Sequence, residues 1–318
     1  MLTVLFGLSG AVVYGAADFL GGLASKRLRA VTVSAVAAAV GIVPLLVGLV
    51  VVGGVSTWTG TLWGAVAGAS GGIGVLLLYR ALAIGPMSVL SPLTAVFAAV
   101  VPVLVAVFRG TALSGLAIAA LVVAVVAVVL VAAVGDTSGA RVTVSGLVTA
   151  AVAGCGFGGI VLAYDMTPSE SGVAPLVVAR VLQAVLLGAA AVVSARWVRP
   201  GGAGDPAAPA DVAGSPEPRG PVVRPAPVRS RGSGRWPTRL LLTVVACGVL
   251  DAMANVFIQA GLHSSDDPVT LPVVSVLNAL YPIGTVVLAG VVLRERLTPV
   301  QWTGIGLAFA ASVGLALA

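Results

Sequence analysis

The chain has 318 residues, of which 59% are hydrophobic and only 9% are charged, and its mean hydropathy is +1.13. A soluble domain carries about 25% charged residues, so this composition excludes a soluble enzyme. The formal net charge of +6 would suggest nucleic acid in a soluble domain, but basic loops on a cytoplasmic membrane face explain it better. The composition therefore predicts a multi-pass protein of the cytoplasmic (plasma) membrane, in contact with the lipid bilayer and with no nucleic-acid partner.

Long apolar runs, separated by charged residues or by Gly and Pro, follow one another along the chain. A membrane-spanning helix takes about 20 residues. Backbone groups in lipid must be hydrogen-bonded within their own segment, which favours helices over isolated strands. We therefore predict an all-α integral membrane protein with ten transmembrane helices. Their predicted ranges are 4–24, 31–52, 61–82, 87–108, 112–134, 144–164, 173–196, 239–261, 270–293 and 299–317.

The order of these spans indicates an internal duplication. A short polar break separates five spans from five more, and both halves run from a proline-containing fourth span through a basic turn into a fifth. Secondary transporters are commonly built from such repeats, with the substrate site between them. We predict a first five-helix repeat at 1–135, an inter-repeat loop at 136–142 and a second repeat at 143–318.

One segment of the second repeat differs in composition from all the others. Residues 200–238 are rich in Pro, Gly, Ala, Ser and Arg, and such a segment cannot bury an apolar core. We predict a disordered linker between the seventh and eighth spans. A plain tether is the simplest interpretation, and contact of its arginines with anionic lipid is the alternative.

Basic residues predict the orientation, because Lys and Arg near helix ends favour the cytoplasmic side. With the N-terminus outside, every Lys and Arg except Arg109 and Arg180 falls on the cytoplasmic side, including those of the linker. The opposite loops would then hold Asp165, Glu170 and the pair at 266–267. We predict that both termini lie outside and that the linker is cytoplasmic.

Several motif-like patterns carry no catalytic signal. GCGFGG at 154–159 fits a dinucleotide-binding pattern but lies inside a span, so it predicts a close-packed helix surface instead. No Walker A sequence is present, which excludes ATP-driven pumping by this chain alone. Cys155 and Cys247 each stand alone in an apolar run, and we expect neither a disulfide nor a metal site. We predict no catalytic residues, no metal and no cofactor.

The polar residues within the spans are the candidate functional groups, because an ionisable group at the membrane centre needs a partner or a wet cavity. Asp251, Asn255 and Gln259 follow one another at i, i+4 and i+8, which places them on one helical face. Such a stripe predicts a cavity that binds a substrate or a proton, and hydrogen-bonded packing between helices is the alternative.

The remaining candidates come from the first, seventh and ninth spans, and each has a structural alternative. Asp18 in the first span shares a helical face with Tyr14, one turn earlier, or instead faces the basic residues 26–27 at the end of the span. An arginine in the seventh span pairs with Asp251, binds an anionic group, or extends to the surface. An asparagine and a tyrosine precede Pro282, which bends the ninth span and often marks a binding cavity. These candidates are Asp18, Tyr14, Arg180, Asn278 and Tyr281.

The sequence resembles the drug/metabolite transporter superfamily, and in particular the EamA-domain transporters. The resemblance rests on LYPIGTVVLAGVVLRERLTPVQWTGIGLAFAASVGLAL (280–317), YRALAIGPMSVLSPL (79–93) and YGAADFLGG (14–22). It implies two inverted five-helix EamA repeats that move small metabolites by alternating access. Glu295 matches the acidic turn position of the second repeat, whereas the first repeat has Thr111 in the corresponding turn.

These observations favour a secondary transporter of small molecules, such as amino acids or drug-like solutes, with a midplane site between the repeats. Asp251 or Asp18 would exchange protons or neutralise a cationic group of the substrate. An intramembrane enzyme or a non-transporting scaffold or channel are the alternatives. Substrate identity, direction and coupling ion stay open, and so does assembly into a homodimer.

Overall fold

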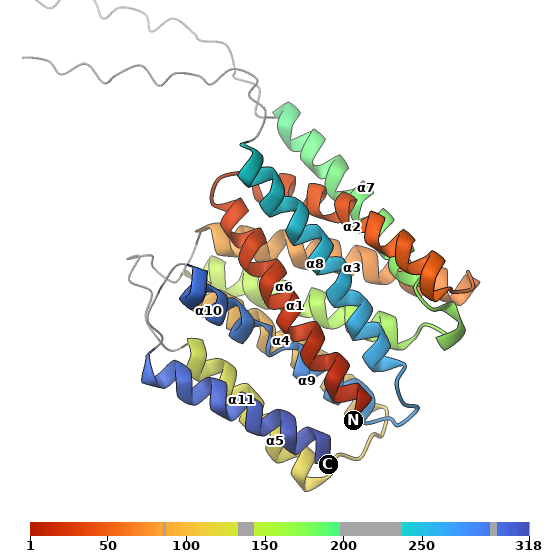
Figure 1. The fold of residues 1–318 in the computed structure, drawn as a ribbon, viewed down its shortest axis with the longest axis vertical. Coiled ribbons are helices and arrows are strands. Elements are labelled where there is room, and N and C mark those ends of the chain that lie inside the picture. Colours follow the sequence, from red (N-terminus) through yellow and green to blue (C-terminus); the bar gives the residue numbers. More distant parts are fainter. Residues whose placement is uncertain (85–86, 133–142, 198–236, 293–297, 318) are drawn as a thin grey trace, which may run out of the picture.

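A computed structural model of the chain shows a bundle of helices that run roughly alongside one another (Figure 1). It describes residues 1–84, 87–132, 143–197, 237–292 and 298–317. In these ranges every regular element is a helix. The predicted loop at 136–142 and Glu295 lie outside the described residues, as does the predicted linker apart from its last two residues.

The helices coincide with the predicted spans to within a few residues. The described elements are α1 (Leu2–Ser25), α2 (Ala30–Val52), α3 (Trp58–Ile84), α4 (Met87–Phe108), α5 (Gly115–Ala132), α6 (Val144–Asp165), the 3-10 helix η1 (Ser169–Ser171), α7 (Ala174–Trp197), α8 (Thr238–Leu262), α9 (Thr270–Asn278), α10 (Tyr281–Val292) and α11 (Pro299–Leu317).

The ninth predicted span is two helices, and the expectation of one continuous helix over 270–293 is wrong. α9 ends at Asn278 and α10 begins at Tyr281, directly before Pro282. Proline has no N–H to donate to the preceding turn and is accommodated best in the first turn of a helix. The predicted bend at Pro282 is therefore a break that separates Asn278 from the following turn.

Six of the described helices are long and apolar enough to cross a membrane: α1, α2, α3, α6, α7 and α8. Shorter apolar stretches lie within α4, α5, α9–α10 and α11. Large apolar side chains cover much of the outer surface, for example Val50, Trp58 and Phe108, each more than 80% exposed. A surface of this kind suits hydrocarbon, and the chain is a multi-pass membrane protein.

The helices pack in pairs that recur across the bundle. The most extensive contacts join α1 with α8 and α3 with α6. Further contacts join α3 with α7 and α2 with α8, and α4 packs on α6 while α9 and α10 pack on α1. α2 also packs on α7, and α5 lies beside α11 at one edge of the bundle (Figure 1). The helices α1, α3, α6, α7 and α8 thereby enclose the interior.

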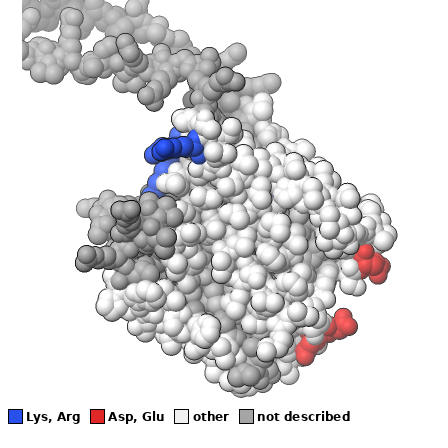
Figure 2. All heavy atoms as spheres, viewed as in Figure 1, with Lys and Arg blue, Asp and Glu red and all other residues white. Residues whose placement is uncertain are grey.

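The two ends of the bundle differ in charge. Figure 2 shows basic side chains near one end of the visible face and acidic side chains at the opposite end. The ends marked N and C lie together at one end of the bundle in Figure 1, and α1 runs from there to the basic turn at 26–29 at the other. The termini therefore lie opposite that basic turn.

Glycines of α6 allow two neighbouring helices to approach closely, as the GCGFGG pattern predicts. A Cβ on Gly156 would lie 2.9 Å from the carbonyl oxygen of Ser70 in α3, and one on Gly158 would lie 3.0 Å from Cβ of Val101 in α4. The Ser70 hydroxyl donates a hydrogen bond to the Gly156 carbonyl over 2.9 Å. This close packing fixes the position of α6, which lines the interior.

Replacement of Gly156 with valine tests this packing. The new side chain would meet backbone atoms of α3, which cannot rotate away, and such overpacking typically costs about 1–3 kcal/mol. We expect the variant to unfold at a lower temperature than the wild type in detergent. Gly188 has no atom within 4 Å of its Cβ position, so Gly188→Val is the matched control. Equal loss of stability in both variants would contradict the close contact of α3 with α6.

Candidate functional site

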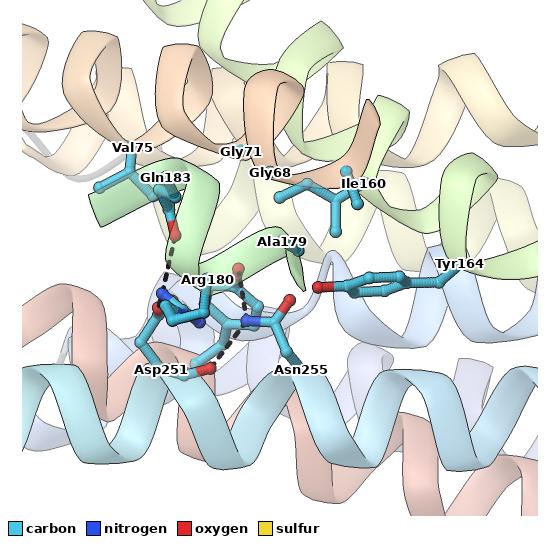
Figure 3. Close-up of a pocket in the computed structure, with 12 residues that line it drawn as sticks. Gly68, Gly71, Val75, Ile160, Tyr164, Ala179, Arg180, Gln183, Asp251 and Asn255 are labelled. Atoms are coloured by element: carbon cyan, nitrogen blue, oxygen red, sulfur yellow. Dashed lines mark hydrogen bonds and ion pairs between the residues drawn. The ribbon is translucent and has the colours of Figure 1, made fainter. Parts of the chain in front are cut away.

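The centre of the bundle holds a buried ion pair between α7 and α8. The Arg180 guanidinium donates through Nη1 to Oδ2 of Asp251, and the two side chains are only 6% and 9% exposed. The same Nη1 donates to Oε1 of Gln183 over 2.9 Å (Figure 3). Of the three sequence-based alternatives for Arg180, the structure therefore selects pairing with Asp251 and not extension to the surface. An isolated charge in this interior would be costly, and each ion stabilises the other.

The predicted polar stripe of α8 lies inside the bundle. Asn255 donates from Nδ2 to the backbone carbonyl of Asp251 over 2.8 Å, and its Nδ2 lies 3.5 Å from the Tyr14 hydroxyl on α1. Gln259 donates from Nε2 to the Thr167 hydroxyl over 3.3 Å. The three stripe residues are all buried. They join α8 to α1, to α7 and to the connection after α6.

A small cavity lies beside the ion pair. Its water-accessible volume is about 10 Å³, which is room for about one water molecule. Glycines of α3 form part of its wall, and Ile160 and the Tyr164 hydroxyl approach it from α6 (Figure 3). The lining residues are Tyr14, Ala67, Gly68, Gly71, Val75, Ile160, Tyr164, Ala179, Arg180, Gln183, Asp251 and Asn255.

A second small cavity lies on the other side of Tyr14 and holds the remaining predicted residues. Asp18 and Asn278 line it and are 4% and 7% exposed. Oδ2 of Asp18 and Oδ1 of Asn278 accept no hydrogen bond from any described residue. Tyr281 also lines this cavity and donates its hydroxyl proton to the Ser91 carbonyl over 3.2 Å. The alternative in which Asp18 faces the basic residues 26–27 is wrong, because its carboxylate is buried in the interior.

Tyr14 connects the two cavities, since it lines both of them together with Ile160. Its ring lies 6.1 Å from the rings of Phe157 and Tyr281, measured between centroids. All eight predicted polar candidates thus lie around two adjoining cavities or on the stripe between them. The structure brings these residues together in the interior of the bundle.

Two functional neighbours were missed by the sequence analysis. Gln183 follows Arg180 by three residues and shares its helical face, so this spacing could have identified it. Thr167 lies in the connection between α6 and α7, where no periodic pattern applies. Its hydroxyl donates to the Tyr164 carbonyl over 2.7 Å and accepts from Gln259.

A larger cavity opens at the end of α8, where the stripe reaches the surface. Its volume is about 450 Å³, and Arg109, Asp165, Thr167 and the acidic pair at 266–267 contribute to its lining. The Arg109 and Asp165 side chains form an ion pair of 3.3 Å. His263 also lines it and lies 3.4 Å from the Thr167 hydroxyl through Nε2. A polar path therefore leads from this cavity through Thr167 to Gln259.

A comparison with family models finds a match for part of the chain. Residues 222–317 match the model of the EamA-like transporter family. This part of the chain is EamA-like. The match confirms the resemblance to the drug/metabolite transporter superfamily. None of the curated proteins matches the chain.

A solved structure described only as a crystal structure of a protein shares the fold. It matches with a TM-score of 0.69 at 15% identity, over 99% of this chain and 96% of the other. Identity this low supports the fold alone. The EamA-like region contains the α8 stripe together with Asn278 and Tyr281, whereas Tyr14, Asp18 and Arg180 lie outside it. The candidate site therefore joins the EamA-like region to the first part of the chain.

Within the described ranges, no group of three or more His, Cys, Asp or Glu side chains could hold a metal ion. Cys155 is exposed, while Cys247 is buried with its Sγ 3.2 Å from the Tyr79 hydroxyl. The polar groups of the interior are thus suited to hydrogen bonding and charge pairing. The family whose model matches residues 222–317 is one of transporters.

The single histidine of the chain offers a direct check of the cavity at the end of α8. Burial lowers the pKa of His263 below its ordinary value of 6.5, while hydrogen bonds to the Tyr164 and Thr167 backbone and the charge of Asp165 oppose that effect. We expect NMR titration of labelled histidine to show a pKa below 6.5. Asp165→Asn should lower this pKa further, because it removes a charge that favours the protonated ring.

Asp266→Asn is the control for the histidine titration, since Asp266 is not among the groups that shift the His263 pKa. We expect it to leave the titration unchanged. A wild-type pKa above 6.5, or a rise in Asp165→Asn, would contradict the described arrangement.

Proposed function

We propose that the protein is a secondary transporter of the cytoplasmic membrane that moves small metabolites, such as amino acids or drug-like solutes, by alternating access. The observation that carries the proposal is the buried Arg180–Asp251 ion pair, which lines one of two adjoining small interior cavities. Ionised side chains inside a membrane bundle are costly and typically mark pathways for substrates or ions. The match of residues 222–317 to a transporter family supports the same function.

The proposal includes ten spans arranged as two inverted five-helix repeats, 1–135 and 143–318. The contacts between helices support it, because they are largely preserved when each helix of the first repeat is exchanged with its counterpart in the second. The counterparts are α1 and α6, α2 and α7, α3 and α8, α4 and α9–α10, and α5 and α11. This exchange converts the α1–α8 contact into the α6–α3 contact, and α3–α7 into α8–α2. It also converts α4–α6 into the packing of α9 and α10 on α1. An odd number of spans in each repeat would give the second repeat the opposite orientation in the membrane.

The size of the cavities supports alternating access. Each of the two interior cavities has room for about one water molecule, and an amino acid is several times larger. A solute can therefore reach Arg180 or Asp18 only after helices separate on one side. The cavity of about 450 Å³ at the end of α8 and the polar path below it favour entry or exit at that end.

The two alternatives have less support. An intramembrane hydrolase would need an activated nucleophile, and the only histidine lies at the bundle's end beside a threonine hydroxyl. A scaffold needs no buried charge at its centre, and the cost of burying Arg180 and Asp251 has no purpose in that case.

Flux through reconstituted vesicles tests the proposal. Vesicles with protein in a known orientation receive a mixed pool of amino acids and metabolites, with and without a pH gradient. Asp251→Asn leaves the Arg180 cation without its partner. Because the proposed site then carries an unpaired cation and lacks its carboxylate, we expect flux through the folded variant to fall at least roughly tenfold.

Glu170→Gln is the matched control, because Glu170 is exposed in η1 and lines none of the cavities described above. We expect wild-type flux from it, and gel filtration and melting curves establish that both variants are folded. Wild-type flux in a folded Asp251→Asn variant would contradict the proposal, and so would the absence of flux from folded wild-type protein.

The proposed orientation places both termini outside and the 200–238 linker in the cytoplasm. It follows from the basic turn at 26–29 and the acidic loops at the other end of the bundle. Single cysteines at positions 27 and 266, in a background of Cys155→Ser and Cys247→Ala, test it. We expect a membrane-impermeant maleimide to label Asp266→Cys in intact cells and Arg27→Cys only after permeabilisation. The reverse pattern would contradict this orientation.

A further inference from the structure

Asp18 is a buried acidic residue without a described counter-ion. It lies on α1, two turns before the end of the helix, and is 4% exposed. Its Oδ2 accepts no hydrogen bond from any described residue. Asp251, by contrast, is paired with the Arg180 guanidinium. The interior therefore holds two acidic side chains, of which only one is neutralised by a described cation.

The helices that pack on α1 offer Asp18 no cation. The main contacts of α1 are with α2, α3, α8, α9, α10 and α11. Among the described residues of these helices the only basic ones are Arg80 and Arg239, and both are exposed near an end of their helix. The only acidic one is Asp251. An ionised Asp18 would therefore face a second negative charge and no positive charge of its own.

The other ionisable groups near Asp18 are hydroxyls and a thiol. The Tyr79 hydroxyl lies against α1 one turn beyond Asp18, and it is 3.2 Å from Sγ of Cys247. Tyr14 and Tyr281 line the same small cavity as Asp18, and the Tyr281 hydroxyl donates its proton to a backbone carbonyl of α4. None of these neutral groups can balance the charge of a carboxylate.

The cavity beside Asp18 restricts which ligand could neutralise it. Its water-accessible volume is about 10 Å³, which is room for about one water molecule and for no organic cation. Hard divalent cations take six or more oxygen ligands, and the cavity wall is largely apolar. An acidic group that lacks a partner in such surroundings becomes neutral by taking up a proton. The proton is therefore the ligand that fits.

We propose that Asp18 binds the proton that couples solute movement to a pH gradient, while Asp251 stays ionised beside Arg180. With the cavity closed, Asp18 is the neutral acid. When water reaches it from one side, the O–H bond breaks, the proton passes to water and the carboxylate remains. The carboxylate takes up a proton from the medium on the other side later in the cycle. This inference rests on the proposed transport function and names its coupling ion.

The wall of α10 beside Asp18 provides a place for water to enter. A Cβ on Gly15 would touch the Tyr281 carbonyl oxygen and would lie 3.0 Å from Cα of Gly284. The Thr285 hydroxyl donates to the Gly15 carbonyl over 3.1 Å. This contact of α1 with α10 comes directly after the break between α9 and α10. Movement of α10 at that break would separate it from α1 one turn from Asp18.

Infrared difference spectroscopy of the purified protein in detergent tests the proton site without transport. The C=O band of a protonated carboxyl group is separate from the bands of carboxylates and shifts in D₂O. We expect the wild type at neutral pH to show such a band, and the band to decrease as the pH is raised. Asp18→Asn should remove it, and Asp18→Glu should keep it at a changed frequency. Glu170→Gln is the control, because Glu170 is exposed in η1, and should leave it unchanged.

Flux in reconstituted vesicles tests the coupling, with the same mixed pool of amino acids and metabolites. We expect a pH gradient in one sense to accumulate the transported solutes in wild-type vesicles, and the opposite gradient to expel them. In Asp18→Asn the accumulation ratio should fall to one, while solutes still equilibrate down their own gradients. The amide resembles the neutral acid but cannot release a proton. Gel filtration and melting curves establish that the variant is folded.

Several results would overturn the assignment. One is a carboxyl band that survives Asp18→Asn, or that keeps its frequency in Asp18→Glu, which decides the question if Asp18→Asn does not fold. Another is wild-type flux that ignores the pH gradient, or gradient-driven accumulation by folded Asp18→Asn. Loss of downhill equilibration in that folded variant would place Asp18 in solute binding and not in coupling. Absence of any wild-type flux with the Asp18 band intact would instead contradict the proposed function alone.

Discussion

The arrangement of this protein depends on a single physical constraint, the cost of placing ionised groups inside a membrane bundle. Arg180 and Asp251 satisfy it by pairing across α7 and α8, and Arg180 also donates to Gln183. Removal of either ion would leave the other uncompensated, so the two helices must stay in register at this point. The polar stripe of α8 and both interior cavities are arranged around that contact.

The packing of the helices provides the frame that makes the pair tolerable. Glycines of α6 bring α3 and α4 close, and Gly248 of α8 meets the backbone of Ala37 in α2, so these helices approach closely at their glycines. The cavities beside the ion pair and beside Asp18 each have room for about one water. The same interfaces contain few interlocking side chains, which is compatible with helices that shift against each other during transport.

Much of the helical fold and part of the site could be predicted from the sequence. Hydropathy located the helices because lipid imposes long uninterrupted apolar runs, and the spacing of Asp251, Asn255 and Gln259 identified a buried face without reference to tertiary structure. The sequence predicted a bend at Pro282, whereas the structure has a break between α9 and α10. A proline at this position is compatible with a bent helix and with two separate helices, so the sequence alone does not distinguish them. The orientation of the termini and the repeat arrangement stay predictions.

Tertiary contacts decided what the local pattern could not. Three alternatives were open for Arg180, and only the packing of α7 against α3 and α2 turns its side chain toward α8. Asp18 has basic residues two turns away along its own helix, yet it lines an interior cavity to which the distant residue Asn278 also contributes. Thr167 contributes to the polar path from a connection without periodicity, so no pattern in the sequence could have singled it out.

The most direct test of the central claim separates the structural from the functional role of the ion pair. In the double variant Arg180→Met/Asp251→Leu, two apolar side chains of similar volume replace the two ions, a change that is often neutral or stabilising. We expect this variant to melt at or above the wild-type temperature and to show no solute flux in vesicles. A stable double variant that transports at the wild-type rate would contradict the claim that the pair serves transport.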